Sequence, residues 1–355
     1  MAQPKVIATV RSAGPIGDIE VNVITNRVYF VNPDTEAGTI GVLDGRTNRI
    51  IARINVGRLP TQLGINPQTN RIYVPNFRDD TVSVINGRTN QVIKTVKVGR
   101  MPDNIGVNVR NNLIYVTSIV GIIFVIDGKT NQIKTKIEVG GRPSRIVINE
   151  LTNRIYVTNT INNSVSVING NTQAIIATIK VGNNPVITPA LNVITNRIYV
   201  ANNLSRFLSV INGRNNKLLQ NVQLGRLQSE VVINPLTNRI YVSSAQVEGK
   251  GKLFVINGSN NKIITTRVLP TSSNITINPN TNHLFVGNFD KNHMSVYNAT
   301  TFKRLARFPS VSGSTVLNPL TNRVYVGGND SITVIQDVPE LIRLGKHNFK
   351  KSAHH

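Results

Sequence analysis

The chain has 355 residues, 40% of them hydrophobic, and its 40 Lys and Arg against 17 Asp and Glu give a net charge of +23. It contains no cysteine, which excludes disulfides, thiolate metal sites and cysteine nucleophiles. No run approaches the roughly twenty apolar residues of a membrane-spanning helix, and the surplus of positive charge favours an anionic partner.

The first residues predict a strand that belongs with the end of the chain. Residues 1–5 lack the apolar stretch of a secretory signal, so the cytoplasm is the default expectation, with secretion or the cell surface as the alternative if a signal was removed. Residues 5–10, KVIATV, match the segment that closes a later repeat, IIATIK at 175–180. We therefore expect them to form a fourth strand rather than a first.

From residue 26 a segment of the type Asn-Arg-Ile-Tyr-Val recurs eight times. Its aromatic residue stands at positions 29, 73, 115, 156, 199, 241, 285 and 325. Each unit holds four short runs rich in Val and Ile, which in the second unit are Leu63–Asn66, Arg71–Pro75, Thr81–Ile85 and Gln91–Val98. Four antiparallel strands in about 42 residues are typical of a propeller blade. The sequence thus predicts an all-β, eight-bladed β-propeller of four-stranded antiparallel blades.

Two turns recur between the strands of each unit. Asn-Pro-Gln-Thr-Asn at 66–70 separates the first two strands of the second unit, and Asn-Gly-Arg-Thr-Asn at 86–90 separates the last two. Asn-Gly is a strong hairpin signal because both residues tolerate φ > 0. One asparagine column should tie the first turn to its own backbone: Asn22, Asn66, Asn108, Asn149, Asn192, Asn234, Asn278 and Asn318.

Two further columns are interpreted as structural. The repeated tyrosines should pack between blades. Arginines follow the turn asparagine in six copies, at positions 27, 71, 154, 197, 239 and 323. Such regular placement favours contacts between blades over the alternative, a cationic rim.

The last unit provides three strands, near 314–318, 322–327 and 331–336, and lacks a fourth. The N-terminal strand should complete this C-terminal blade and so close the ring, which removes two exposed sheet edges. Residues 1–337 are then one propeller domain. Residues 338–355 form a basic tail that we expect to be flexible, and its final His pair is typical of a tag remnant.

The repeat resembles that of YVTN-repeat β-propellers, which occur in archaeal surface-layer proteins and in many bacterial proteins. Tyr156-Val-Thr-Asn159 spells the motif, and the resemblance extends over about residues 5–337. It implies the propeller fold, with seven blades, common in that family, as the alternative to eight. It also implies a structural, surface-layer-type display role as one candidate function, although a fold does not specify an activity.

Variation between the copies gathers on one expected face of the ring. Connections from a fourth strand to the next first strand carry arginines that should face one another near the channel mouth, where guanidinium groups suit phosphate or carboxylate. At the head of each first strand, one column is polar in every copy yet differs between copies. The candidate ligand-binding residues at this mouth are Gln62, Asn104, Arg145, Glu230, Asn274, Arg58, Arg100, Arg142 and Arg226.

Loops between the second and third strands add aromatic residues beside charge. Phe77 and Arg78 stand in one such loop, and Phe289 and Lys291 stand in the loop five blades further on. Exposed aromatic rings can stack on bases or sugars, whereas loop phenylalanines also commonly pack inward. We treat these four residues as candidate loop contacts.

The sequence leaves three functions open. The favoured one is a non-catalytic binding or scaffold propeller, a monomer that engages an anionic polymer, nucleic acid among them, or an acidic protein surface. Surface-layer-type display is the second. A lactonase- or lyase-like enzyme is the third, with Arg145 and Glu230 as electrophile and base. The few histidines form no cluster with metal-ligand spacing, so we expect no metal and no cofactor.

Overall fold

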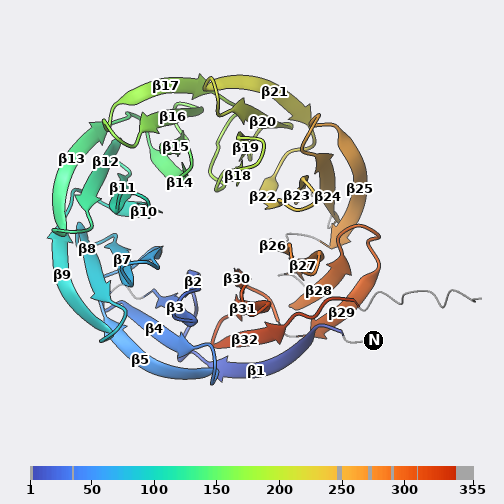
Figure 1. The fold of residues 1–355 in the computed structure, drawn as a ribbon, viewed down its shortest axis with the longest axis horizontal. Helices are drawn as coiled ribbons and strands as arrows, with labels where there is room; N and C mark the ends of the chain where they lie inside the picture. Colours follow the sequence, from blue (N-terminus) through green and yellow to red (C-terminus); the bar gives the residue numbers. More distant parts are fainter. Residues whose placement is uncertain are drawn as a thin grey trace, which may run out of the picture.

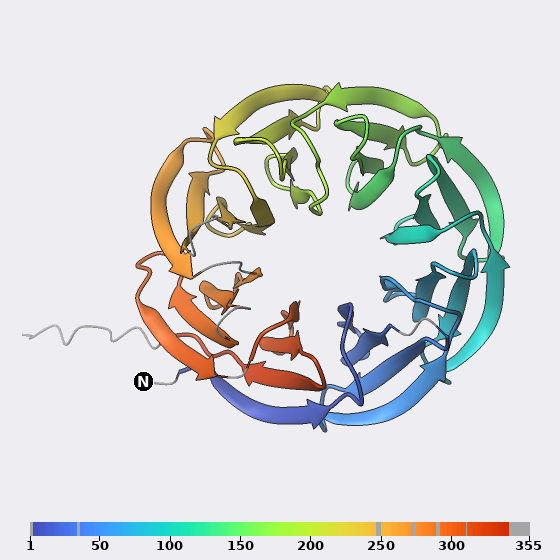
Figure 2. The same cartoon turned by 180° about the vertical axis from the view of Figure 1, so that it is seen from behind.

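The computed structural model describes residues 3–33, 36–245, 250–270, 274–288, 292–309 and 311–340. Within them, eight four-stranded antiparallel sheets stand side by side in a ring around a central channel (Figure 1). The predicted eight-bladed β-propeller is confirmed, and the alternative of seven blades is wrong. Figure 2 shows the same closed ring from behind.

The blades follow chain order, and each runs from the channel outward. Blades 1 to 4 consist of β2 (Ile19–Asn22), β3 (Arg27–Asn32), β4 (Thr39–Asp44) and β5 (Arg49–Asn55); β6 (Gly64–Asn66), β7 (Arg71–Asn76), β8 (Thr81–Asn86) and β9 (Gln91–Lys97); β10 (Pro102–Asn108), β11 (Leu113–Ser118), β12 (Ile122–Asp127) and β13 (Gln132–Glu138); and β14 (Pro143–Asn149), β15 (Arg154–Asn159), β16 (Ser164–Asn169) and β17 (Ile175–Lys180).

Blades 5 to 8 repeat the same plan. They consist of β18 (Ala190–Asn192), β19 (Arg197–Ala201), β20 (Phe207–Asn212) and β21 (Lys217–Gln223); β22 (Gln228–Asn234), β23 (Arg239–Ser244), β24 (Lys250–Asn257) and β25 (Ile263–Pro270); β26 (Ile275–Asn278), β27 (His283–Asn288), β28 (His293–Asn298) and β29 (Arg304–Pro309); and β30 (Ser314–Asn318), β31 (Arg323–Gly327), β32 (Ser331–Gln336) and β1 (Lys5–Arg11).

Blade 8 combines the two ends of the chain. β1 pairs antiparallel with β32, from Lys5 opposite Gln336 to Arg11 opposite Ser331, and forms the outer strand of that sheet. Figure 1 shows β1 in blue outside β32 in red. The predicted closure is therefore confirmed, and the ring has no open sheet between its first and last blades.

The hydrophobic core lies between blades rather than within one. Eight buried clusters each join the facing sides of two neighbouring blades; one combines Tyr73, Val82 and Val84 of blade 2 with Ile114 and Phe124 of blade 3. The repeated tyrosines are fully buried in these clusters, as the sequence predicted. Each blade thus depends on its neighbours for burial of its apolar faces.

The asparagine column performs two tasks. Within a blade, the Asn22 Oδ1 accepts the N–H groups of Ile24 and Thr25, which is the predicted tie of the first turn. Between blades, its Nδ2 donates to the Oδ1 of Asn70 in the next blade at 2.9 Å. The same bond recurs as Asn66–Asn112, Asn108–Asn153, Asn149–Asn196, Asn192–Asn238, Asn234–Asn282, Asn278–Asn322 and Asn318–Asn26. We call this closed circuit the asparagine ring.

The hairpin glycines are required for a reason other than the positive φ that the sequence suggested. Gly87 does not have positive φ; the left-handed residue of that hairpin is Asn90, with φ of 55°. A Cβ on Gly87 would instead lie 2.2 Å from the Oδ1 of Asn70, an acceptor of the asparagine ring. Glycine is required there because a side chain from the neighbouring turn occupies the space.

Four of the six arginines of the column donate hydrogen bonds to the next blade, which confirms the structural interpretation at these positions. Arg27 donates to the carbonyl of Gly87 in the next blade, and Arg323 of blade 8 donates to Gly45 of blade 1. Arg197 donates to the carbonyl oxygen of Gly258 at 2.5 Å. These guanidinium groups therefore serve ring assembly.

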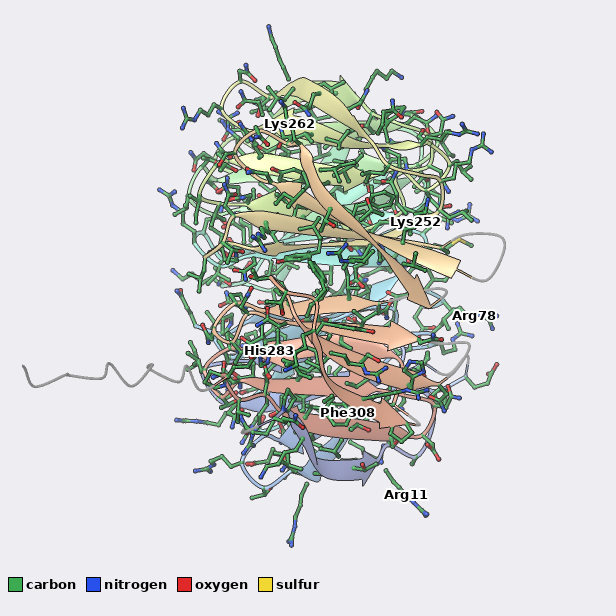
Figure 3. All side chains as sticks on the ribbon, turned by 90° about the vertical axis from the view of Figure 1, so that its right-hand side faces the viewer. Arg11, Arg78, Lys252, Lys262, His283 and Phe308 are labelled. Carbon is green, nitrogen blue, oxygen red and sulfur yellow. The ribbon has the colours of Figure 1, made fainter. Side chains whose placement is uncertain are left out.

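The connections form two distinct faces, which lie at opposite sides of Figure 3. The turn face carries the turns between first and second strands and the hairpins between third and fourth strands, with Lys262 and His283 as markers. The loop face carries the other connections, with Arg11, Arg78 and Lys252 as markers.

We predict that Asn192→Ala destabilises the protein by about 3 kcal/mol, because it removes one bond of the asparagine ring and two bonds to the turn backbone in a buried place. Thermal or urea unfolding measures the change. Asn162→Ala, at an exposed loop position, is the control and should change stability by less than about 0.5 kcal/mol. Equal effects of both substitutions would contradict the role of the ring.

A second matched pair tests the glycine contact. Gly87→Ala should destabilise by about 1–3 kcal/mol, since its Cβ would overlap Asn70. Gly225→Ala, where a Cβ meets nothing within 4 Å, should be neutral or slightly stabilising. Unfolding midpoints measure both changes, and a Gly87→Ala variant as stable as the parent protein would contradict the steric role of Asn70.

Candidate functional site

The central channel holds a cavity of about 390 Å³ that residues from six blades line. Four of the predicted ligand-binding residues, Gln62, Arg145, Glu230 and Asn274, lie on it. Asn104 is buried beside it and donates a hydrogen bond to the Oε1 of Gln62. The structure therefore gathers the strand-head column around one axis.

The strand-head side chains also bond to the blade that follows. The carboxylate of Asp18 accepts the N–H of Leu63 at 2.9 Å, and Glu230 accepts the N–H of Ile275 at 2.8 Å. Arg145 donates its Nε–H to the carbonyl of Val186 at 3.2 Å. Side chains of several kinds can form a hydrogen bond to the backbone of the following blade. This accounts for a column that is polar in every blade although its residue type differs between blades.

Three carboxyl groups on the channel wall have raised pKa values. Burial, together with the neighbouring Asp18 carboxylate, raises the pKa of Glu20 to about 8. Burial raises the pKa of Asp18 to about 6, although the hydrogen bond from the N–H of Leu63 acts to lower it. Burial likewise raises the pKa of Glu230 to about 7, although the hydrogen bond from the N–H of Ile275 acts to lower it. Asp18 and Glu20 are half-buried and line the cavity, and their raised pKa values bring their titration closer to neutral pH than is usual for carboxyl groups.

Sequence reasoning missed Glu20 as a candidate. It lies two residues after Asp18 on β2, so both side chains point to the same side of the strand. The equivalent positions in the next two blades are Gly64 and Gly106. A single charge in an otherwise small or apolar column was the signal that could have revealed it.

The predicted arginines of the loop face differ in their surroundings. Arg58 forms an ion pair with Asp79, with 2.6 Å between Nε and Oδ1, and its backbone N–H donates to the same carboxylate. Arg100, Arg142 and Arg226 are exposed, and no carboxylate of the described residues lies within 4 Å of their guanidinium nitrogens. Three of the four are therefore available to a ligand.

Two of the four predicted loop contacts, Phe77 and Arg78, lie within the described residues. Arg78 is exposed on the loop face (Figure 3), and Phe77 beside it is half-buried. Phe289 and Lys291 lie outside the described residues. The loop of blade 2 thus offers a cation with an aromatic ring that is partly covered.

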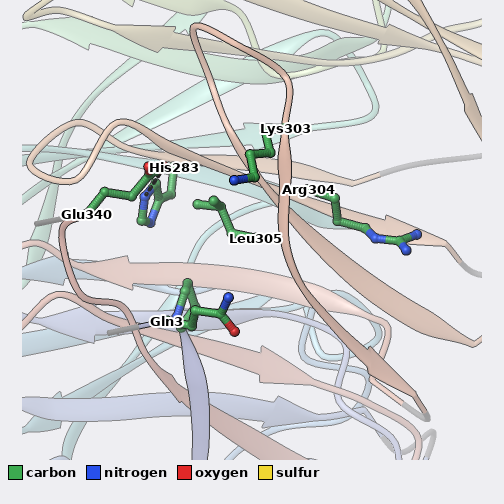
Figure 4. A pocket seen from close by; sticks show the side chains of 7 residues that line it. Gln3, His283, Lys303, Arg304, Leu305 and Glu340 are labelled. Atoms are coloured by element: carbon green, nitrogen blue, oxygen red, sulfur yellow. Dashed lines mark ion pairs between the residues drawn. The ribbon is translucent and has the colours of Figure 1, made fainter. Parts of the chain in front are cut away.

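A second, smaller cavity of about 40 Å³ lies on the turn face between blades 7 and 8 (Figure 4). His283 lies there, with its Nδ1 2.7 Å from Asp337 and its Nε2 3.8 Å from Glu340. Asp337 also accepts hydrogen bonds from Asn278 and Thr281, so it joins three side chains of blade 7 to blade 8. This arrangement replaces the arginine contact of other blades and is a structural latch.

Among the residues that the structure describes, no group of three or more His, Cys, Asp or Glu could hold a metal ion. Within the same residues, no helix is long and apolar enough to cross a membrane. The site that the fold does build is a polar channel mouth beneath a cationic loop face. The exposed guanidinium groups of that face suit the binding of an anion.

The channel carboxyls make stability depend on pH. A carboxyl whose pKa is raised in the folded state stabilises the protein fully below its unfolded pKa, near 4, and loses that contribution as pH rises through the folded value. We predict that Glu20→Gln flattens the fall of unfolding free energy between pH 5.5 and 7 by up to about 1.4 kcal/mol per pH unit. Urea unfolding across pH measures this slope.

The exposed Glu150 on the turn face supplies the control for this measurement. Glu150→Gln should leave the pH slope as in the parent protein. If Glu20→Gln also leaves it unchanged, the raised pKa of Glu20 is wrong.

No family model and no curated protein matches this chain, so its assignment to the YVTN-repeat propellers stays a prediction. Solved structures do match. One is the computationally designed Ika8 protein, at 14% identity and a TM-score of 0.73 over 95% of this chain and all of that one. Another is the dihydro-heme d1 dehydrogenase NirN in complex with DHE, at 13% identity and a TM-score of 0.70 over 83% of this chain and 66% of that one. At such identities the likeness shows the propeller fold alone.

Proposed function

We propose that the protein is a non-catalytic binding module that holds an anionic polymer on its loop face. The observation that carries this is the set of exposed guanidinium groups of Arg100, Arg142 and Arg226, which no described carboxylate neutralises. They follow β9, β13 and β21, the fourth strands of blades 2, 3 and 5, and therefore belong to connections on the same face of the ring. Guanidinium groups so placed suit repeated phosphate or carboxylate groups along a chain.

The channel wall supports binding over catalysis. Arg145 and Glu230, the pair that an enzyme would use as electrophile and base, each hydrogen-bond to the backbone of the following blade. Their positions are thus explained by assembly of the ring. The net charge of +23 supports an anionic partner in addition, because it steers polyanions toward the protein at long range.

The test compares two variants that lose the same charge. Arg100→Gln/Arg142→Gln/Arg226→Gln removes three cations from the loop face, and Arg46→Gln/Arg88→Gln/Arg214→Gln removes three exposed cations from the turn face. Single-stranded DNA and heparin serve as probes, with affinity measured across a salt series. For DNA the loop-face variant should reduce the slope of log K against log salt by about 2, since each phosphate contact contributes about 0.7.

The turn-face variant should retain most of the affinity and slope of the parent protein. The comparison of DNA with heparin identifies which polyanion is preferred. Absence of binding to both probes at low salt, or equal losses in the two variants, would overturn the proposal.

A further inference from the structure

Five of the large aliphatic side chains that are exposed on the turn face share one position in the repeat. Each stands two residues after an asparagine of the asparagine ring, in the turn between a first and a second strand. Their exposed fractions are 63% for Ile24, 73% for Leu151, 65% for Ile194, 71% for Leu236 and 73% for Leu320. We call them the apolar ring. The same position holds Gln68, Arg110 and Asn280 in the other three blades, so three of the five aliphatic residues stand in the consecutive blades 4, 5 and 6. Repeated exposure of large aliphatic side chains on one face marks an interaction surface more often than a single exposed residue does.

The turn backbone forces this exposure. The Oδ1 of Asn149 accepts the N–H groups of Leu151 and Thr152, and Asn192 binds Ile194 and Thr195 in the same way. Such an Asx turn fixes the backbone and leaves the side chain of its third residue directed to solvent. The aliphatic side chains cannot turn inward unless these bonds break, so they remain available to an external apolar phase.

The members of the apolar ring lie at one height. In blades 1, 4, 5, 6 and 8 the strands that flank the turn have the same register, with the column asparagine opposite the arginine five residues later, as in Asn149 with Arg154. Equal register gives equal turns, and the ring arranges them around one axis. The five aliphatic side chains therefore occupy equivalent positions on the same face of the ring.

Positive charge surrounds this surface. Arg46, Arg88, Lys129 and Arg214 are exposed at the tips of hairpins between third and fourth strands. These hairpins lie further from the channel than the turns of the apolar ring, because third and fourth strands are the outer strands of each blade (Figure 1). Glu150 and Glu340 are the exposed carboxylates on the described turns of this face, so its balance is cationic.

We propose that the turn face docks on an anionic lipid bilayer, with the apolar ring entering the interfacial region and the hairpin cations contacting lipid headgroups. Exposed aliphatic side chains on equivalent turns, with a cationic border, complement a bilayer, which is apolar beneath its headgroups and negatively charged. A second copy of this chain does not fit, because two cationic faces would repel. Insertion of a few aliphatic side chains and attraction to anionic headgroups each give only weak membrane affinity. Together they give stable but reversible attachment.

This inference goes beyond the proposed function, which uses the opposite face. Vesicles of phosphatidylcholine with about one third phosphatidylserine are the probe, and pure phosphatidylcholine vesicles are the reference. The parent protein should co-sediment with the former and not the latter. Leu151→Ser/Ile194→Ser/Leu236→Ser, in three consecutive blades, should weaken that binding at least about tenfold.

Three exposed aliphatic residues of the loop face provide the matched control: Val120, Ile161 and Leu204. Val120→Ser/Ile161→Ser/Leu204→Ser should bind vesicles as the parent protein does. Because both sets of residues are exposed, neither variant should lower the unfolding midpoint by more than a degree or two.

A tryptophan reporter shows which face meets the lipid, since the chain contains no Trp. The fluorescence of Ile194→Trp should shift to the blue on addition of anionic vesicles, and that of Ile161→Trp should not. A shift in Ile161→Trp alone, retained affinity in the turn-face Ser variant, or no binding to anionic vesicles would each overturn the inference.

The charge variants separate the two proposals. Arg46→Gln/Arg88→Gln/Arg214→Gln should weaken vesicle binding and spare binding of single-stranded DNA, and the loop-face arginine variant should do the reverse. A parent protein that binds anionic vesicles but neither DNA nor heparin would remove the proposed function alone. A parent protein that binds DNA but not anionic vesicles would remove the lipid surface alone.

Discussion

The structure depends on a closed circuit of side-chain hydrogen bonds between asparagines. Each blade donates from the asparagine at the end of its first strand to the asparagine that ends the next blade's turn, and the circuit closes where Asn318 donates to Asn26 across 292 residues of sequence. The accepting asparagines adopt left-handed backbone conformations, with φ near 50°. One bond pattern therefore fixes the turn, the distance between blades and the need for a hairpin glycine beside the acceptor.

The circuit also explains how the repeat divides its residues between assembly and surface. Asparagine, tyrosine and the column arginines are used between blades, where they are buried or bound to a neighbouring carbonyl. The remaining cations lie on the two faces and on the outer strands, as Arg53, Lys94 and Lys134 do, and Arg145 lies at the channel. The loop face is irregular because its connections vary in length and sequence, whereas equal turns make the turn face regular. A polymer-binding surface and a lipid-binding surface would thus follow from the same ring, on opposite sides.

Much of the fold could be predicted because its signals are local. Strand patterns, turn residues and a period near 42 residues identified eight blades, and the match between residues 5–10 and the fourth strands identified the closure. The reason for the glycines was wrong, because the space beside Gly87 is occupied by Asn70, a contact between turns that no local pattern displays. Glu20 was missed because its importance comes from Asp18 beside it and from burial at the channel.

The sequence by itself determined the strands, the number of blades and the positions that repeat, since these depend on propensity and spacing along the chain. It also located the variable polar column and the loop arginines. Only the tertiary structure decided which of them remain free: Asp79 engages Arg58, while Arg100, Arg142 and Arg226 project from the loop face. The physical reason is that partners such as Leu63 for Asp18 come from another blade, 45 residues away, and meet only when the ring is assembled.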